Sequence, residues 1–133
     1  MFVSILRQGD FLIASIHTAL DDEELLRFQK DLVEKIGTYR AQGIIIDVAA
    51  LDVLDSFASR ALRNLAQMAH LRGAATVIVG IQPDVAFAIV ELGMGVDVHT
   101  AAELEEGLAY LETVTSGHRV GRSTLGVVSE RDS

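Results

Sequence analysis

The hydrophobic pattern begins with two runs rich in β-branched and aromatic residues. Phe2–Leu6 and Phe11–Ile16 are separated by Arg7-Gln8-Gly9-Asp10. Glycine and aspartate tolerate the backbone angles that a tight turn between two strands requires. The pattern therefore predicts an N-terminal β-hairpin.

The pattern then changes to a helical period. Four apolar residues recur on one helical face: Leu25, Phe28, Leu32 and Ile36. Asp21 can cap this helix together with Glu24, three residues further on, and Gly37 is expected to end it. The sequence predicts a first amphipathic helix.

Two continuous apolar runs follow, at residues 43–48 and 74–79. Such runs are typical of strands that are covered on both faces in a parallel sheet. The segment between them predicts a helix that begins at Asp55 and has one apolar face. That face comprises Leu62, Leu65, Met68 and Ala69. A strand, a helix and a second parallel strand form a right-handed crossover unit.

The pattern predicts three more elements after residue 79. A third helix has Pro83 in its first turn and stops at Gly93, and Val96–His99 is a short last strand. Thr100 and Glu103 match a capping box for a fourth helix. Its expected buried residues are Leu104, Leu108 and Leu111.

These elements predict an α/β fold with a mixed, mostly parallel β-sheet, an N-terminal hairpin and about four α-helices. We expect one domain over residues 1–113. Residues 114–133 are rich in Ser, Thr, Gly and Arg and lose the helical period, so we expect a flexible C-terminal tail there.

Composition narrows the class of function. The chain has 133 residues, half of them hydrophobic, which is enough for one domain with a real core. A formal charge of −8 disfavours nucleic acid and membrane surfaces as partners. The chain has no cysteine, which excludes disulfides, thiolate zinc sites and cysteine nucleophiles. The first apolar run is too short for a signal peptide or a membrane span, so we expect a cytoplasmic protein.

Candidate chemistry lies where parallel strands end and helices begin, at residues 49–55 and 80–83. Ser56 falls in the first turn of the second predicted helix, where it has two interpretations. In one, Asp55 or Ser56 caps the helix. In the other, Ser56 accepts a phosphate, which a helix N-terminus tolerates.

A magnesium or aspartyl-phosphate site made of Asp47, Asp52 and Asp55 is a weaker interpretation. No acidic pair ends the early strands, and no lysine follows the later strand. The chain also has no Walker loop and no nucleophile elbow, so we expect neither a catalytic site nor a metal or other cofactor.

The order of elements, with Leu54-Asp55-Ser56-Phe57 entering the second helix, resembles the STAS domain. STAS domains include the bacterial anti-anti-sigma factors, in which a partner kinase phosphorylates a serine at this position and thereby breaks the complex. Residues 79–86 and 90–93 are similar to the STAS proteins of the stressosome. Sensor members of that group carry a long N-terminal sensory domain and usually threonine phosphosites. This chain shows neither, so it resembles the scaffold members.

The resemblance implies a scaffold and antagonist rather than an enzyme. Such a protein forms a homo-oligomer or a large hetero-assembly with sensor STAS paralogues and sequesters a switch serine/threonine kinase. It releases the kinase when Ser56 is phosphorylated. A phosphatase resets it. Ser59 is a secondary candidate phosphosite, and the implied partner-binding residues are Asp55, Ser56, Phe57, Ser59 and Arg60. The alternative is a free anti-anti-sigma factor that binds an anti-sigma kinase directly, also through Ser56.

Overall fold

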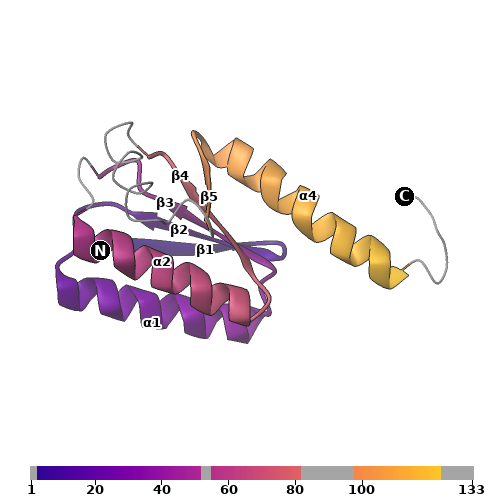
Figure 1. Cartoon of the computed structure of the whole chain (residues 1–133), viewed down its shortest axis with the longest axis horizontal. Helices are drawn as coiled ribbons and strands as arrows, with labels where there is room; N and C mark the ends of the chain where they lie inside the picture. The colour runs from indigo at the N-terminus through magenta and orange to yellow at the C-terminus, as the bar shows by residue number, and fades with distance from the viewer. Residues whose placement is uncertain (1–2, 52–54, 82–97, 124–133) are drawn as a thin grey trace.

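The protein is described by a computed structural model that covers residues 3–51, 55–81 and 98–123, with side chains as far as Thr115. In these ranges a sheet has the strand order β1-β2-β3-β4-β5 (Figure 1). Its strands are Val3–Gln8, Phe11–Ile16, Gly43–Asp47, Ala75–Val79 and His99–Ala101. Only β1 is antiparallel to its neighbour. The predicted mixed, mostly parallel sheet with an N-terminal hairpin is therefore confirmed.

The hairpin turn is shorter than the sequence predicts. β1 continues to Gln8, which pairs with Phe11 in β2, so that only Gly9 and Asp10 lie between the strands. Gly9 has φ of +59°, a backbone angle that glycine adopts without strain.

Helix α1 spans Asp22–Tyr39 and begins with the predicted capping box. The Asp21 carboxylate accepts a hydrogen bond from the Glu24 backbone N–H at 2.8 Å, and the Glu24 carboxylate accepts one from the Asp21 N–H at 2.9 Å. The prediction that Gly37 ends this helix is wrong. Arg40 ends it instead, in a left-handed conformation, with its N–H bonded to the Ile36 carbonyl. Gly37 allows close packing, because a Cβ there would lie 3.1 Å from an Arg72 side-chain nitrogen.

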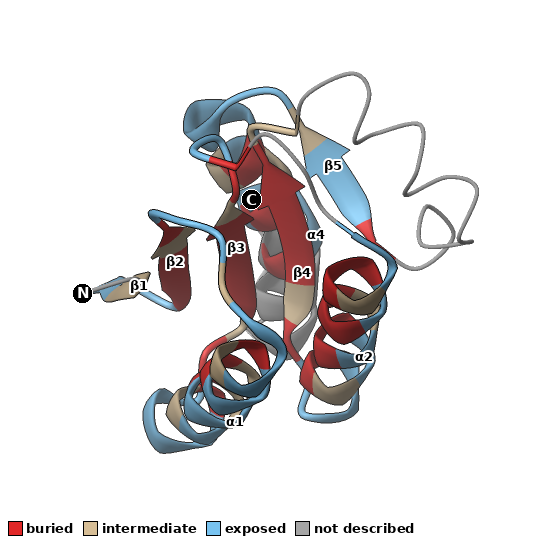
Figure 2. Ribbon diagram, turned by 90° about the vertical axis from the view of Figure 1, so that its left-hand side faces the viewer, coloured by how far each residue is buried: buried red, intermediate tan, exposed pale blue. Residues whose placement is uncertain are grey.

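Three layers make up the fold. Helices α1 and α2 (Ser56–Leu71) cover one face of the sheet, and α4 (Leu104–Ser123) covers the other (Figures 1 and 2). In β3, Ile44 and Ile46 belong to the core beneath α1 and α2, whereas Ile45 belongs to the smaller core beneath α4. This burial on both faces explains the continuous apolar run that predicted a parallel strand.

Helix α2 follows the predicted start and face. Asp55 is its N-cap, and Leu62, Leu65 and Ala69 are buried, while Met68 is half-buried. None of the helices in the described ranges is long and apolar enough to cross a membrane.

The last strand and the capping box after it were predicted wrongly. The described strand is His99–Ala101, with Val98 just before it, whereas the prediction ended the strand at His99; Val96 and Asp97 lie outside the described residues. Thr100 pairs with Ile78 in the sheet. Thr100 therefore does not cap a helix. The carboxylate of Glu106 instead accepts hydrogen bonds from the N–H groups of Ala102 and Glu103, at 3.1 and 3.2 Å. The third predicted helix, from Pro83 to Gly93, lies outside the described residues.

The predicted buried face of helix α4 is confirmed at Leu108 and Leu111 and is wrong at Leu104. Leu111 is fully buried and Leu108 is half-buried, but Leu104 is exposed. Gly107 instead lies against the sheet, because a Cβ there would stand 2.8 Å from a methyl group of Val79. The backbone of α4 therefore comes close to β4 at Gly107.

The expected domain end at residue 113 falls inside α4, which continues to Ser123. Thr115 is buried, so the helix still packs on the fold at that residue. The hydroxyls of Thr113 and Thr115 donate to the carbonyls of Ala109 and Leu111, at 3.0 and 2.7 Å. Because each hydroxyl bonds to a carbonyl of the same helix, these threonines do not interrupt α4. The expectation of a flexible segment from residue 114 rested on composition, which does not reveal such bonds. Residues 124–133 of the expected tail lie outside the described ranges.

Candidate functional site

The carboxyl ends of β3 and β4 position the candidate site. Asp47 and Val79 are partners in these strands, and the next residue, Val48, donates its N–H to the Val79 carbonyl at 3.0 Å. Gly80 has φ of +80°, and a Cβ there would lie 2.7 Å from the Cβ of Ala49. Only glycine fits this contact, which holds the loop after β3 against the loop after β4. Gly80 lies in the loop predicted after the fourth strand, but its contact with Ala49 joins two distant segments, so no local sequence pattern indicates it.

The loop after β3 is folded by local hydrogen bonds. The Asp47 carboxylate accepts from the Ala49 N–H at 2.9 Å, and the Leu51 N–H donates to the Val48 carbonyl at 2.9 Å. Leu51 is buried in the core beneath α2. These contacts anchor the chain shortly before α2 begins. Asp52, which belongs to the same loop, lies outside the described residues.

Asp55 provides the N-cap of α2, which settles which residue performs the capping. Its carboxylate accepts a hydrogen bond from the Ala58 N–H at 2.8 Å, and its carbonyl accepts one from the Ser59 N–H at 2.9 Å. Ser56 is the first residue of the helix and is exposed. Its hydroxyl forms no hydrogen bond with any described residue. It is therefore available for other chemistry, and its phosphorylation stays a prediction.

The other residues expected to bind a partner differ in exposure. Asp55 and Arg60 are exposed, and Phe57 is half-buried against the core. Ser59 is fully buried, and no described residue forms a hydrogen bond with its hydroxyl. A kinase could not reach Ser59 without opening the helix, so the accessible members of this set are Asp55, Ser56, Arg60 and the half-buried Phe57.

The electrostatics of the helix start suit a phosphate. The first turn of α2 contains no acidic residue, so among the described residues at the helix start only the Asp55 cap places a negative charge near its backbone N–H groups. The aspartates do not form an evident metal site in the described ranges. There, no group of three or more His, Cys, Asp or Glu side chains could hold a metal ion, and the Asp47 carboxylate is bonded to its own loop.

Comparison with known proteins agrees with this architecture. A model of the STAS domain matches residues 3–107. A structure of RsbS from Moorella thermoacetica, solved with a serine replaced by glutamate, is 32% identical and has a TM-score of 0.75. The match covers 86% of this chain and 97% of that one. A chain in a structure of the stressosome, described there as a signal integration and transduction hub, is 30% identical with a TM-score of 0.68. That match covers 84% of this chain and 98% of the other.

A curated relative is more distant and much longer. The RsbT co-antagonist protein RsbRA of Bacillus subtilis is 28% identical over 90 residues, which cover 67% of this chain but 33% of RsbRA. The match thus spans about a third of that relative's length. Unphosphorylated SpoIIAA, an anti-sigma factor antagonist, shares the fold with a TM-score of 0.69 at 15% identity, over 86% of this chain and 96% of that one.

Proposed function

The chain belongs to the STAS domain family, and we propose that it is a phosphorylation-switched scaffold and antagonist of a stressosome. In this proposal it co-assembles with sensor STAS paralogues of the RsbR type and sequesters a serine/threonine switch kinase of the RsbT type. Phosphorylation of Ser56 releases the kinase, and a phosphatase restores the original state. Support comes from the similarity to RsbS and RsbRA over most of the STAS domain.

The exposed hydroxyl of Ser56 is the observation that carries the proposal. Because Asp55 already caps α2, modification of Ser56 removes no hydrogen bond that holds the described helix start together. A phosphate at this position lies near the positive end of the helix dipole, so the folded domain tolerates it. The switch therefore needs no unfolding of α2.

Kinase release follows from charge. A phosphate adds about −1.5 to −2 charges at neutral pH, directly beside the Asp55 carboxylate. A kinase surface that fits neutral serine would then repel the phosphate. The phosphate would also lose its bound water on docking without gaining a positively charged partner. A penalty of about 3 kcal/mol corresponds to an affinity loss of about a hundredfold, which is enough to release a kinase bound with micromolar affinity.

The charge mechanism is tested by measuring the affinity of the partner kinase, of the RsbT type, for three variants. Ser56→Ala should bind like the wild type, and Ser56→Asp should bind more weakly. Asn64→Asp is the matched control, because Asn64 is exposed on the same helix two turns further on. It should leave affinity unchanged. Equal kinase affinity for the two Ser56 variants would refute the mechanism.

The modification itself is tested by incubating the protein with the kinase and ATP, then mapping phosphosites by mass spectrometry. We expect phosphate on Ser56 and none on Ser59. Phosphate found only elsewhere would contradict the assignment of Ser56.

Assembly size separates the proposal from the free anti-anti-sigma factor. Mixed with its sensor paralogue, a scaffold should elute as a very large particle, whereas a diffusible antagonist should remain in small complexes. A small complex that still binds the kinase through Ser56 would favour the free antagonist.

A further inference from the structure

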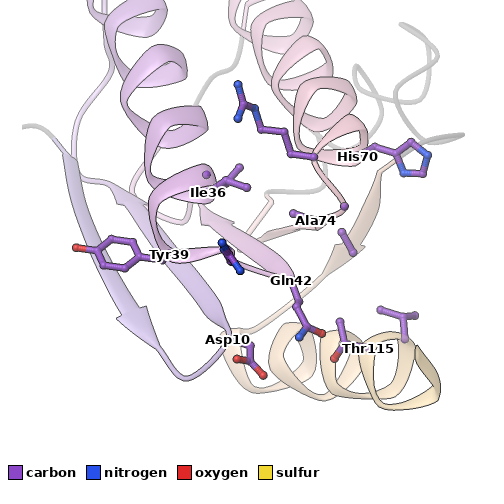
Figure 3. Close-up of a pocket in the computed structure, with 13 residues that line it drawn as sticks. Asp10, Ile36, Tyr39, Gln42, His70, Ala74 and Thr115 are labelled. Atoms are coloured by element: carbon purple, nitrogen blue, oxygen red, sulfur yellow. The ribbon is translucent and has the colours of Figure 1, made fainter. Parts of the chain in front are cut away.

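A cavity of about 910 Å³ lies at the end of the sheet opposite Ser56. Figure 3 shows that its walls come from the hairpin turn at Asp10, the end of α1 at Tyr39, Gln42, the end of α2 at His70, and Thr115 of α4. Two arginines, Arg40 and Arg72, also line it. Asp10 is the one carboxylate among the lining residues.

The topology of the fold separates charge between the two ends of the sheet. Helices α1, α2 and α4 each follow a strand of the parallel set and run back along it, so all three begin at the same end. Acidic residues stabilise helix starts and basic residues stabilise helix ends, because they oppose the helix dipole. In this fold, charges that suit the helix dipoles fall at two opposite ends of the sheet: α1 has three acidic residues in its first turn, and α2 has His70 in its last turn.

The acidic end is where the helices start. Its described segments are residues 17–24, 47–51, 55–58, 80–81 and 101–106, and they contain neither lysine nor arginine. They contain nine carboxylates: Asp21, Asp22, Glu23, Glu24, Asp47, Asp55, Glu103, Glu105 and Glu106. Asp22 and Glu23 are both exposed, and neither belongs to the capping box of α1.

The basic end surrounds the cavity. It contains Arg7, Arg40, Arg72 and His70, against the carboxylates of Asp10 and Glu112. It is also apolar, since three of the six exposed large hydrophobic residues of the described chain lie there. They are Tyr39, Leu71 and Val114, and Leu71 is 84% exposed. Apolar side chains beside arginines are typical of protein interfaces.

We propose that the basic end is a docking surface for the acidic end of a second copy of this chain, with Asp22 and Glu23 of α1 entering the cavity. Charge complementarity supports this partner, because the chain carries −8 overall while the cavity is lined by two arginines and one carboxylate. The contact is head-to-tail: it joins two different surfaces, so each pair still exposes one free acidic end and one free basic end. Further copies can therefore be added through the same contact. It deepens the co-assembly part of the proposed function, but it involves neither Ser56 nor the kinase.

The mass of the full-length chain in solution, measured by analytical ultracentrifugation over a concentration series, tests the docking. The wild type should self-associate at low ionic strength and dissociate as salt is added, because salt screens exposed charge pairs. Arg40→Glu/Arg72→Glu and Asp22→Lys/Glu23→Lys should each weaken association at least about tenfold.

Mixing the two double variants gives the sharpest result. The first retains a normal acidic end and the second retains a normal basic end, so the mixture should form a one-to-one complex at concentrations where each variant alone is expected to associate only weakly. The matched control is Arg27→Glu/Lys30→Glu, which makes the same charge change at exposed positions along α1. It should associate like the wild type.

Several results would overturn the docking inference. They are a wild type that stays monomeric at low salt, a mixture that forms no complex, or a control that weakens association as much as Arg40→Glu/Arg72→Glu. Association lost in the arginine variant but kept in Asp22→Lys/Glu23→Lys would also overturn it, because the cavity would then receive a different acidic group. Circular dichroism establishes that each variant is folded. Kinase affinity is measured separately, so failure of the Ser56 switch and failure of this docking can be distinguished.

Discussion

Replacing Gly80 by alanine should destabilise the protein more than replacing Gly73 by alanine, although the two glycines have similar positive φ angles. Their φ angles are +80° and +85°. Around Gly73 a new Cβ would meet no atom within 4 Å, whereas at Gly80 it would lie 2.7 Å from the Ala49 Cβ and 2.9 Å from the Ala49 backbone. The pair therefore separates backbone strain from steric overlap.

The expected magnitudes follow from these two terms. Alanine in the left-handed region costs about 1 kcal/mol at either position, after allowing for the lower entropy of the unfolded chain. The overlap at Gly80 adds about 1–3 kcal/mol, because the atoms that must move belong to backbone as well as side chain. We expect losses of about 1 kcal/mol for Gly73→Ala and about 2–4 kcal/mol for Gly80→Ala, or roughly 4 °C in Tm for each kcal/mol.

Urea unfolding followed by circular dichroism measures both losses. Gly80→Ala should also weaken kinase binding, because it displaces the loop that leads to Ser56. Equal losses of stability for the two variants would refute the contact between Gly80 and Ala49, since that overlap is the reason for expecting the larger loss at Gly80.

Three further predictions concern single side chains. Leu111→Ala should cost about 2–5 kcal/mol in urea unfolding, because Leu111 is fully buried, whereas Leu104→Ala at an exposed position should cost under about 1 kcal/mol. Similar losses would contradict the observed face of α4. Asp55→Ala should lower stability by about 1 kcal/mol in thermal unfolding, and Asp55→Asn, which retains a capping oxygen, should lose much less. Ser59→Ala should be neutral or stabilising, because it removes a buried hydroxyl that has no partner among the described residues. A loss above about 1 kcal/mol for Ser59→Ala would show that this hydroxyl is hydrogen-bonded.

Local signals in the sequence determined most of the elements. The capping box of Asp21 and Glu24 spans four residues and is complete within one turn, so it forms wherever α1 is placed. Asp55 likewise caps α2 through a bond to Ala58, three residues on. The continuous apolar runs predicted β3 and β4, because consecutive residues of a strand point to opposite faces of the sheet. A strand buried on both faces is therefore apolar at consecutive positions.

The position of Ser59 could also have been inferred from the sequence. It lies three residues before Leu62 and seven before Ala66, in phase with the apolar face of α2, and the structure buries all three. Ser56 and Ser59 look alike as hydroxyls near a helix start. Helical phase separates them into an exposed residue and a core residue.

Tertiary structure alone decided the features in which distant segments meet. Thr100 and Glu103 match a capping box, but pairing of Thr100 with Ile78 places Thr100 in a strand, a long-range contact that no local pattern specifies. Leu104 and Leu111 are equally apolar, but Leu111 lies against Gly43 of β3 and is buried, whereas Leu104 is exposed. The acidic and basic ends likewise exist only because a parallel sheet aligns the helix starts. Charged residues far apart in the sequence add up to one electrostatic potential only when the fold places them close together.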